Sequence, residues 1–132
     1  MNTISALPPL LLVAIGGGTG AMLRYLVGRW ALAAFGPGFP VGTLAVNLLG
    51  GLVMGLVVGM LARVNEGGEH LRLLIGVGVL GGFTTFSAYS LETKRMIERN
   101  DWVGASTYSI GSVIAGLAAV AIGLAMAKRV LG

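Results

Sequence analysis

Four long apolar segments constrain the fold of this chain more than any other feature of its sequence. They are Leu10–Ala33, Thr43–Ala62, Leu71–Ser90 and Val103–Ala127. A helix needs about 20 mainly apolar residues to cross the hydrocarbon core of a bilayer, and each segment supplies that length. The connectors between them are short and contain the Gly, Pro and charged residues of turns: Phe35–Pro40, Arg63–His70 and Lys94–Asp101. We therefore predict an all-α integral membrane protein whose residues 1–132 form one four-helix domain.

The composition supports a membrane location and excludes several kinds of site. Hydrophobic residues make up 55% of the chain and charged residues 11%, and the mean hydropathy is +0.88. About 25% of the residues of a soluble domain are charged. The chain has no cysteine and one histidine, His70, which excludes disulfides and Cys/His zinc sites. The N-terminal residues lack the Lys or Arg of a signal peptide, so we expect them to belong to the mature first span.

Basic residues are balanced between the two ends of the predicted bundle. Both termini and the second connector share one end, with Arg63, Arg72, Lys128 and Arg129; the other end has Arg29, Lys94, Arg95 and Arg99, plus Arg24 if it reaches that surface. Orientation normally follows an excess of Lys and Arg on the cytoplasmic side. This near-balance favours insertion in both orientations and an antiparallel homodimer, unless Arg24 or a local effect fixes one orientation. The basic residues form no patch, so we expect no nucleic-acid partner.

Small residues recur at four-residue spacing, which lets helices approach closely in lipid. The series are Gly16 and Gly20; Gly51, Gly55 and Gly59; and Gly111, Ala115, Ala119 and Gly123. Asn47 lies four residues before Gly51, among aliphatic residues, and its carboxamide needs hydrogen-bond partners there. Two interpretations of Asn47 are open. Its side chain either forms an interhelical hydrogen bond, which contributes about 0.6 kcal/mol, or acts as a hydrogen-bond donor that lines a pathway.

The positions of the acidic residues argue against an enzyme. Glu66, Glu69, Glu98 and Asp101 lie in connectors, and Glu92 lies at the end of the third span. No nucleophile–base pair or metal cluster can be assembled in the membrane interior from these residues. A proton-coupled exporter normally carries an acid within the bilayer. Its absence counts against the alternative function, a small four-span multidrug or cation exporter that works as an antiparallel dimer.

The stretch GGFTTFSAYSLE, Gly81 to Glu92, interrupts the third apolar segment. Two glycines followed by β-branched Thr84 and Thr85 favour a local departure from helix. Carbonyl groups freed in a bilayer must be buried in protein or bind something, and such oxygens are cation ligands. We therefore predict a helix–break–helix arrangement in this span.

After the break, Phe86 and Tyr89 are three residues apart and share one helix face. The edges of aromatic rings are positive. Together with the hydroxyl groups of Thr85, Ser87 and Ser90, they favour an anion that is held weakly enough to be released. The alternative is a kinked span in which both rings only pack.

Three motifs of this chain resemble those of the Fluc/CrcB family of small dual-topology fluoride channels. They are GGGTGAMLRY (Gly16–Tyr25), GTLAVNLLGG (Gly42–Gly51) and GGFTTFSAYSLE, in the same order and spacing and covering nearly the whole chain. The resemblance implies an antiparallel homodimer with two pathways, which passively exports fluoride across the bacterial inner membrane. A small-solute exporter and a non-conducting scaffold are the alternative classes.

The resemblance also implies residue roles. Asn47 is the carboxamide that faces the pathway, and Phe86 and Tyr89 hold the two ring positions of an aromatic box. Tyr89 departs from the family, where the second ring is usually Phe. A hydroxyl track is expected from Thr43, Ser87, Ser90, Tyr108 and Ser112, with Glu92 near its end, Arg24 near a vestibule, and Gly116 where some members have a further serine. The backbone carbonyls of Gly81 and Thr84 in each subunit are expected to hold a structural Na⁺ ion on the dimer axis, and no organic cofactor is expected.

Overall fold

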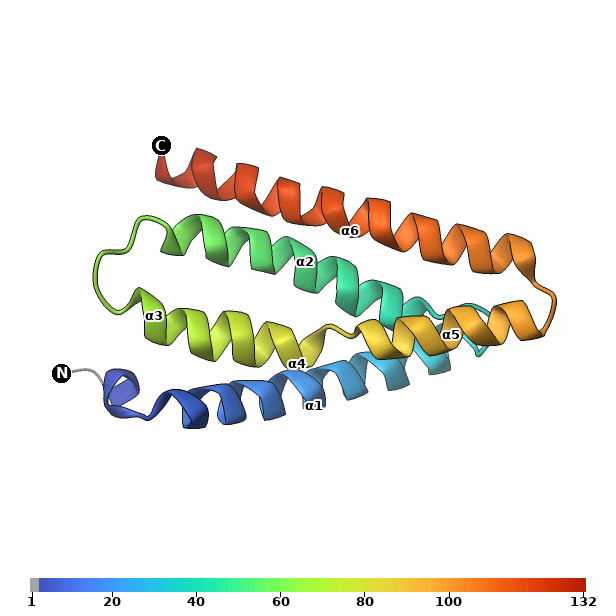
Figure 1. Ribbon diagram of the computed structural model, residues 1–132, viewed down its shortest axis with the longest axis horizontal. Helices are drawn as coiled ribbons and strands as arrows, with labels where there is room; N and C mark the ends of the chain where they lie inside the picture. The colour runs from blue at the N-terminus through green and yellow to red at the C-terminus, as the bar shows by residue number, and fades with distance from the viewer. Residues whose placement is uncertain (1–2) are drawn as a thin grey trace.

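The computed structural model describes residues 3–132, and Figure 1 shows that they form a bundle of long helices. After a short 3₁₀ turn, η1 (Thr3–Ala6), the elements are α1 (Pro9–Phe35), α2 (Val41–Leu61), α3 (Gly68–Leu71), the π-helix η2 (Arg72–Leu80), α4 (Gly81–Phe83), α5 (Phe86–Glu98) and α6 (Trp102–Leu131). The third span is therefore a composite of α3, η2, α4 and α5. Four stretches are long and apolar enough to cross a membrane, as the sequence predicted.

Local signals explain where the helices begin and end. Pro9 is the first residue of α1, where its missing amide hydrogen costs nothing, and Gly36 ends α1 with a φ of 73°. Asp101 caps α6 by accepting a hydrogen bond from the Gly104 amide at 2.9 Å.

The third span is longer than predicted, because α5 continues to Glu98. Most of the segment Lys94–Asp101, predicted as a connector, is therefore helix, and the true turn is Arg99–Asp101. The charged residues of this segment are good helix formers, and Lys94 pairs with Glu98 one turn later at 3.3 Å.

Two helix crossings depend on glycine. In the α2–α6 crossing, a Cβ atom on Gly55 would lie 3.0 Å from the Gly123 Cα atom. In the crossing between α1 and η2, a Cβ atom on Gly16 would lie 2.9 Å from the Gly78 Cα atom. The predicted series thus mark real contacts at Gly16, Gly55 and Gly123, whereas a Cβ atom on Gly111 would meet nothing within 4 Å.

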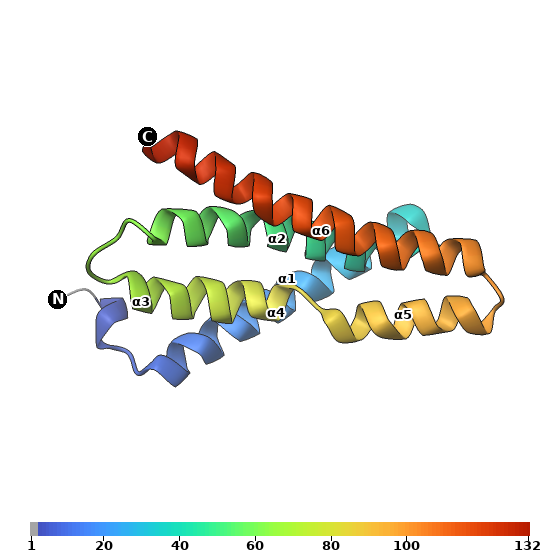
Figure 2. The same cartoon turned by 45° about the horizontal axis from the view of Figure 1, so that its top comes forward.

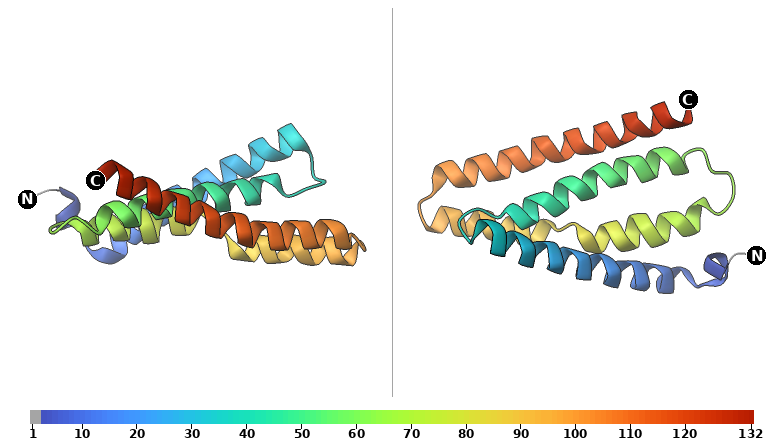
Figure 3. Two further views of the ribbon diagram at one scale, coloured as in Figure 1. Left: turned by 90° about the horizontal axis from the view of Figure 1, so that it is seen from above. Right: turned by 180° about the vertical axis from the view of Figure 1, so that it is seen from behind.

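The third span changes partner along its length. Its first half, η2, packs on α1, whereas α5 packs on α6, as the views in Figure 2 and Figure 3 show. The contact between α5 and α6 encloses a small core of Met96, Ala105 and Tyr108. Both termini and the α2–α3 connector lie at one end of the bundle, and the α1–α2 and α5–α6 connectors lie at the other. The basic residues therefore divide between the ends as the sequence predicted.

Candidate functional site

The helix break in the third span lies at Thr84 and Thr85. Their φ and ψ angles are −86° and 158°, and −153° and 122°, which are extended conformations. The Thr85 hydroxyl then caps α5 by accepting a hydrogen bond from the Ala88 amide at 3.2 Å. The β-branched threonines prefer extended backbone, and Thr85 supplies a cap, so together they account for the restart of the helix.

The glycines before the break are helical, contrary to the expectation that they take part in it. Gly81 and Gly82 belong to α4. Gly82 instead serves packing, because a Cβ atom there would lie 3.1 Å from the Ala21 amide nitrogen of α1. Arg24 of α1 reaches the same turn, and its Nε atom donates to the Gly82 carbonyl oxygen at 3.0 Å.

Asn47 of α2 bridges directly to the break. Its Nδ2 atom donates to the Thr85 carbonyl oxygen at 3.0 Å, and its Oδ1 atom accepts from the Thr85 amide at 2.8 Å. The carboxamide thus pairs with one residue as a neighbouring β-strand would, and it satisfies backbone groups that the break leaves without helical partners. Of the two interpretations of Asn47, the interhelical bond is present. Nδ2 retains a second hydrogen, so a role as a pathway donor stays a prediction.

The break also leaves carbonyl oxygens available. None of the hydrogen bonds that cross it within the described residues reaches the carbonyl of Gly81 or Thr84, because the Thr85 amide bonds Asn47 and the Ala88 amide bonds the Thr85 side chain. Backbone oxygens of this kind are ligands for hard cations such as Na⁺.

Three aromatic rings continue from the break toward α6. The ring centroids of Phe86 and Tyr89 are 5.5 Å apart at an interplanar angle of 35°, and those of Tyr89 and Tyr108 are 5.4 Å apart at 40°. The predicted shared face of Phe86 and Tyr89 is therefore present. Phe86 is 77% exposed, whereas Tyr108 is 1% exposed. The Tyr89 hydroxyl donates to the Ser109 carbonyl oxygen at 2.9 Å, which turns it toward α6.

Glu92 joins three helices at one point. Its two carboxylate oxygens accept hydrogen bonds from the hydroxyl groups of Thr43 on α2 and Tyr108 on α6, both at 2.7 Å. Glu92 lies inside α5 and not at the end of the span as predicted, because α5 continues for six more residues. Thr43 is the third residue of α2, so the carboxylate is level with the first turn of that helix.

The other predicted track residues are only partly connected. Ser87 lies 3.3 Å from the Thr85 hydroxyl, and Ser90 is exposed. The Ser112 hydroxyl lies one helical turn beyond Tyr108, buried and without a hydrogen-bond partner among the described residues. An unpaired buried hydroxyl is available to a ligand.

Two contacts of this cluster were not anticipated from the sequence. Phe39, from the α1–α2 connector, meets the Tyr108 ring edge-on at a centroid distance of 5.5 Å and 88°. Ser109 accepts the Tyr89 hydroxyl through its backbone. The sequence carried no local signal for either contact, because each joins segments distant along the chain.

The sequence of this chain matches a known protein family. The family model described as "CrcB-like protein, Camphor Resistance (CrcB)" matches residues 11–124. A protein of Phenylobacterium zucineum is 57% identical over 122 residues, which cover 92% of this chain and 96% of the relative. Proteins of Caulobacter sp. strain K31 and Novosphingobium aromaticivorans are 55% and 53% identical, over 92% and 89% of this chain and 95% and 94% of their own lengths. All three relatives are named fluoride-specific ion channel FluC.

Proposed function

The chain belongs to the CrcB family, and from this membership we infer that it is a multi-pass membrane channel for fluoride, not an enzyme. The observation that carries the inference is the agreement over 92% of the chain with relatives named for fluoride. We propose further that transport is passive, so that fluoride leaves the cytoplasm down its electrochemical gradient.

The proposed route follows the polar and aromatic groups between the break and α6. An anion would meet the ring edges of Phe86 and Tyr89 and then the Ser112 hydroxyl, which has no partner among the described residues. The Tyr108 and Thr43 hydroxyls beyond it give their hydrogens to Glu92 and would have to turn away from that carboxylate to donate to the ion. Along the rings and hydroxyl groups the ion would be stabilised by ring edges and weak donors, which allow it to be released again. Asn47 and Arg24 donate hydrogen bonds to the carbonyl oxygens of residues at or beside the break, and they thereby fix the position at which the proposed route begins.

The proposed assembly is an antiparallel homodimer with one route per subunit. Phe86 and Ser87 are exposed in the single chain, at the mid-span break. Polar groups at that depth are costly against lipid, so a second copy that covers them is favoured. The near-balance of basic residues between the two ends supports opposite orientations of the two copies.

The available carbonyls suit the proposed structural sodium ion. Gly81 is exposed in the subunit, next to the break, and the Gly81 and Thr84 carbonyls receive none of the bonds that cross it. Two oxygens from each of two subunits would supply four ligands. The ion would hold the subunits together, because it offsets the partial negative charges of carbonyl oxygens that would otherwise face each other.

Fluoride efflux from liposomes tests the proposed channel. Purified protein is reconstituted into liposomes loaded with potassium fluoride, valinomycin balances the charge, and no proton gradient is imposed. We expect rapid fluoride efflux and no efflux from matched chloride-loaded liposomes. Export that requires a proton gradient, or that carries an organic cation, would instead support the four-span exporter.

The aromatic edge of Phe86 is tested by Phe86→Ile, which keeps an apolar side chain but removes the polarised ring. We expect fluoride efflux to fall about tenfold or more, the loss that results when about 1.4 kcal/mol of stabilisation is removed. Leu91→Ile is the matched control, because Leu91 is an exposed aliphatic residue of the same helix and carries no ring. Unchanged efflux in Phe86→Ile would mean that the ring only packs.

A further inference from the structure

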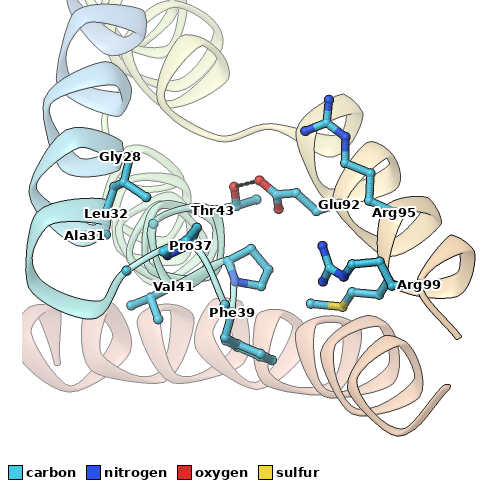
Figure 4. Close-up of a pocket in the computed structure, with 15 residues that line it drawn as sticks. Gly28, Ala31, Leu32, Pro37, Phe39, Val41, Thr43, Glu92, Arg95 and Arg99 are labelled. Carbon is cyan, nitrogen blue, oxygen red and sulfur yellow. Dashed lines mark hydrogen bonds between the residues drawn. The ribbon is translucent and has the colours of Figure 1, made fainter. Parts of the chain in front are cut away.

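A cavity of about 310 Å³ opens between the α1–α2 connector, the first turn of α2 and the second half of α5 (Figure 4). Its floor contains Thr43 and Glu92, which are joined by a hydrogen bond. The cavity therefore touches the hydroxyl groups at one end of the proposed route. Its outer wall is formed by the end of α5, where Arg95 lies in the last turn and Arg99 is the residue that follows the helix.

Three of the described residues that line this cavity are charged: Glu92, Arg95 and Arg99. Both oxygens of Glu92 accept hydrogen bonds from neutral hydroxyl groups. Neither guanidinium has an ion-pair partner within residues 3–132, where the ion pairs are Arg72–Glu69 and Lys94–Glu98. The lining therefore carries a net positive charge, with two unpaired cations outside and one carboxylate at the floor.

The two arginines lie where they can attract an anion that has entered the cavity but has not yet reached Thr43 and Glu92. Figure 4 shows the Arg99 side chain extending from α5 toward the α1–α2 connector, with Arg95 on the neighbouring turn. Clefts lined by charge of one sign, with walls of low dielectric constant, focus the field and raise the local concentration of the opposite ion. A guanidinium that keeps its hydration in an open cavity attracts an anion without trapping it.

We propose that Arg95 and Arg99 form an anion-collecting mouth that raises the rate at which fluoride reaches the Thr43–Glu92 end of the route. The proposal rests on the proposed fluoride conduction and adds two residues that determine its rate. The arginines act through long-range attraction, so their effect must depend on ionic strength. A structural role of either side chain would not show that dependence.

The variants must preserve the balance of basic residues between the two ends, because removing charge from one end alone would bias insertion. Arg99→Gln is therefore combined with Arg129→Gln at the opposite end. The matched control is Arg99→Lys with Arg129→Gln, which keeps the positive charge at the cavity and carries the same compensating change at the opposite end. Arg95→Gln with Arg129→Gln tests the second arginine, and Arg99→Lys tests charge without the guanidinium shape.

Initial fluoride efflux is measured from phosphatidylcholine liposomes at low fluoride, with potassium gluconate setting the ionic strength. At about 10 mM salt, where the Debye length is about 30 Å, we expect each Arg→Gln variant to be roughly two- to fivefold slower than the control. At about 1 M salt, where that length is about 3 Å, the difference should vanish. Arg99→Lys should match the parent protein at both concentrations.

Two results would overturn the collecting mouth. The first is that the Arg→Gln variants release fluoride as fast as the control at every ionic strength. The second is that they are slower than the control by the same factor at low and at high salt, which would indicate a structural role. In both cases the parent and control proteins still conduct fluoride. If the parent protein itself conducts none, the proposed function fails instead, so the two failures are distinguishable.

Discussion

At the scale of single residues, Asn47 shows how one carboxamide can make a helix break tolerable inside a membrane. Its paired bonds to the Thr85 amide and carbonyl, at 2.8 and 3.0 Å, replace the helical partners that both groups lack. Each buried polar group left unpaired costs about 1–3 kcal/mol. Asn47 therefore sets the geometry of the break, and its second Nδ2 hydrogen is the one that the proposed route would use.

Asn47→Asp tests both roles. An ionised carboxylate can still accept from the Thr85 amide, but it opposes the Thr85 carbonyl oxygen and places negative charge beside an anion's route. We expect fluoride efflux to fall at least about tenfold and the free energy of unfolding to fall by about 1–3 kcal/mol. Efflux and thermal unfolding of monodisperse protein are the measurements. Normal efflux in this variant would contradict a role for Asn47 in conduction.

Tyr89→Phe tests the one ring position at which this chain departs from the family pattern. The Tyr89 hydroxyl donates to the Ser109 carbonyl, so its removal should cost about 1 kcal/mol of stability. The ring contacts with Phe86 and Tyr108 remain, and we expect fluoride efflux within about twofold of the parent, well under the tenfold that 1.4 kcal/mol represents. A tenfold loss of efflux in this variant would show that the hydroxyl itself takes part in conduction.

At the scale of elements, the break at Thr84 and Thr85 separates two halves of one span that have different partners. The half before it, η2, packs on α1 through Gly16 and Gly78, and the half after it, α5, packs on α6. A continuous helix could not follow both neighbours. The break thus lets the second half of the third span bring Tyr89 and Glu92 against Tyr108.

Sequence reasoning succeeded where the signal was local. Apolar length gave the four spans, small-residue spacing gave the crossings at Gly55 and Gly123, and GGFTTFS gave the existence of a break. It located the break at Thr84 and Thr85 but began it too early, because Gly81 and Gly82 are poor helix formers, and contact between Gly82 and α1 accompanies their helical conformation. The bonds from Thr43 and Tyr108 to Glu92 join three distant segments, so no local pattern could reveal them.

Gly123→Ala tests the α2–α6 crossing. A Cβ atom there would lie 2.8 Å from the Leu56 amide nitrogen, so the helices must separate, and we expect a loss of about 1–3 kcal/mol of stability. Gly111→Ala on the same helix is the control, because its Cβ atom meets nothing within 4 Å. The control should be neutral or stabilised by about 0.5–1 kcal/mol. Equal melting temperatures for the two variants would contradict close packing at Gly123.

At the scale of the whole molecule, most of the surface of each span faces outward, toward lipid or the proposed second copy. Only 11–17% of each spanning window is buried within the single chain, and Phe86 at the break is largely exposed. The near-balance of basic residues between the two ends is compatible with a second copy that inserts in the opposite orientation beside it. The proposed sodium ion belongs to this scale, because one chain offers only part of its ligand set.

Replacement of sodium tests that ion. Exchange of Na⁺ for N-methyl-D-glucamine should lower both the melting temperature of the dimer and its fluoride efflux, and returning Na⁺ should restore both. A ligand present at 100 times its dissociation constant stabilises the folded state by about 2.7 kcal/mol. Melting is a readout independent of conduction. An unchanged melting temperature in sodium-free buffer would argue against a structural ion.

The interruption at Thr84 and Thr85 also places two helix termini in the middle of the third span, where an unbroken span would have none. The turn before it ends in carbonyl oxygens and carries partial negative charge, and the first turn of α5 begins with amide groups and carries partial positive charge. Adjacent points at the same depth can therefore attract ions of opposite sign: Gly81 and Thr84 offer oxygens to a cation, while the start of α5, beside Phe86, favours an anion. In the proposed dimer, the backbone itself would thus separate the cation site from the anion route at mid-span.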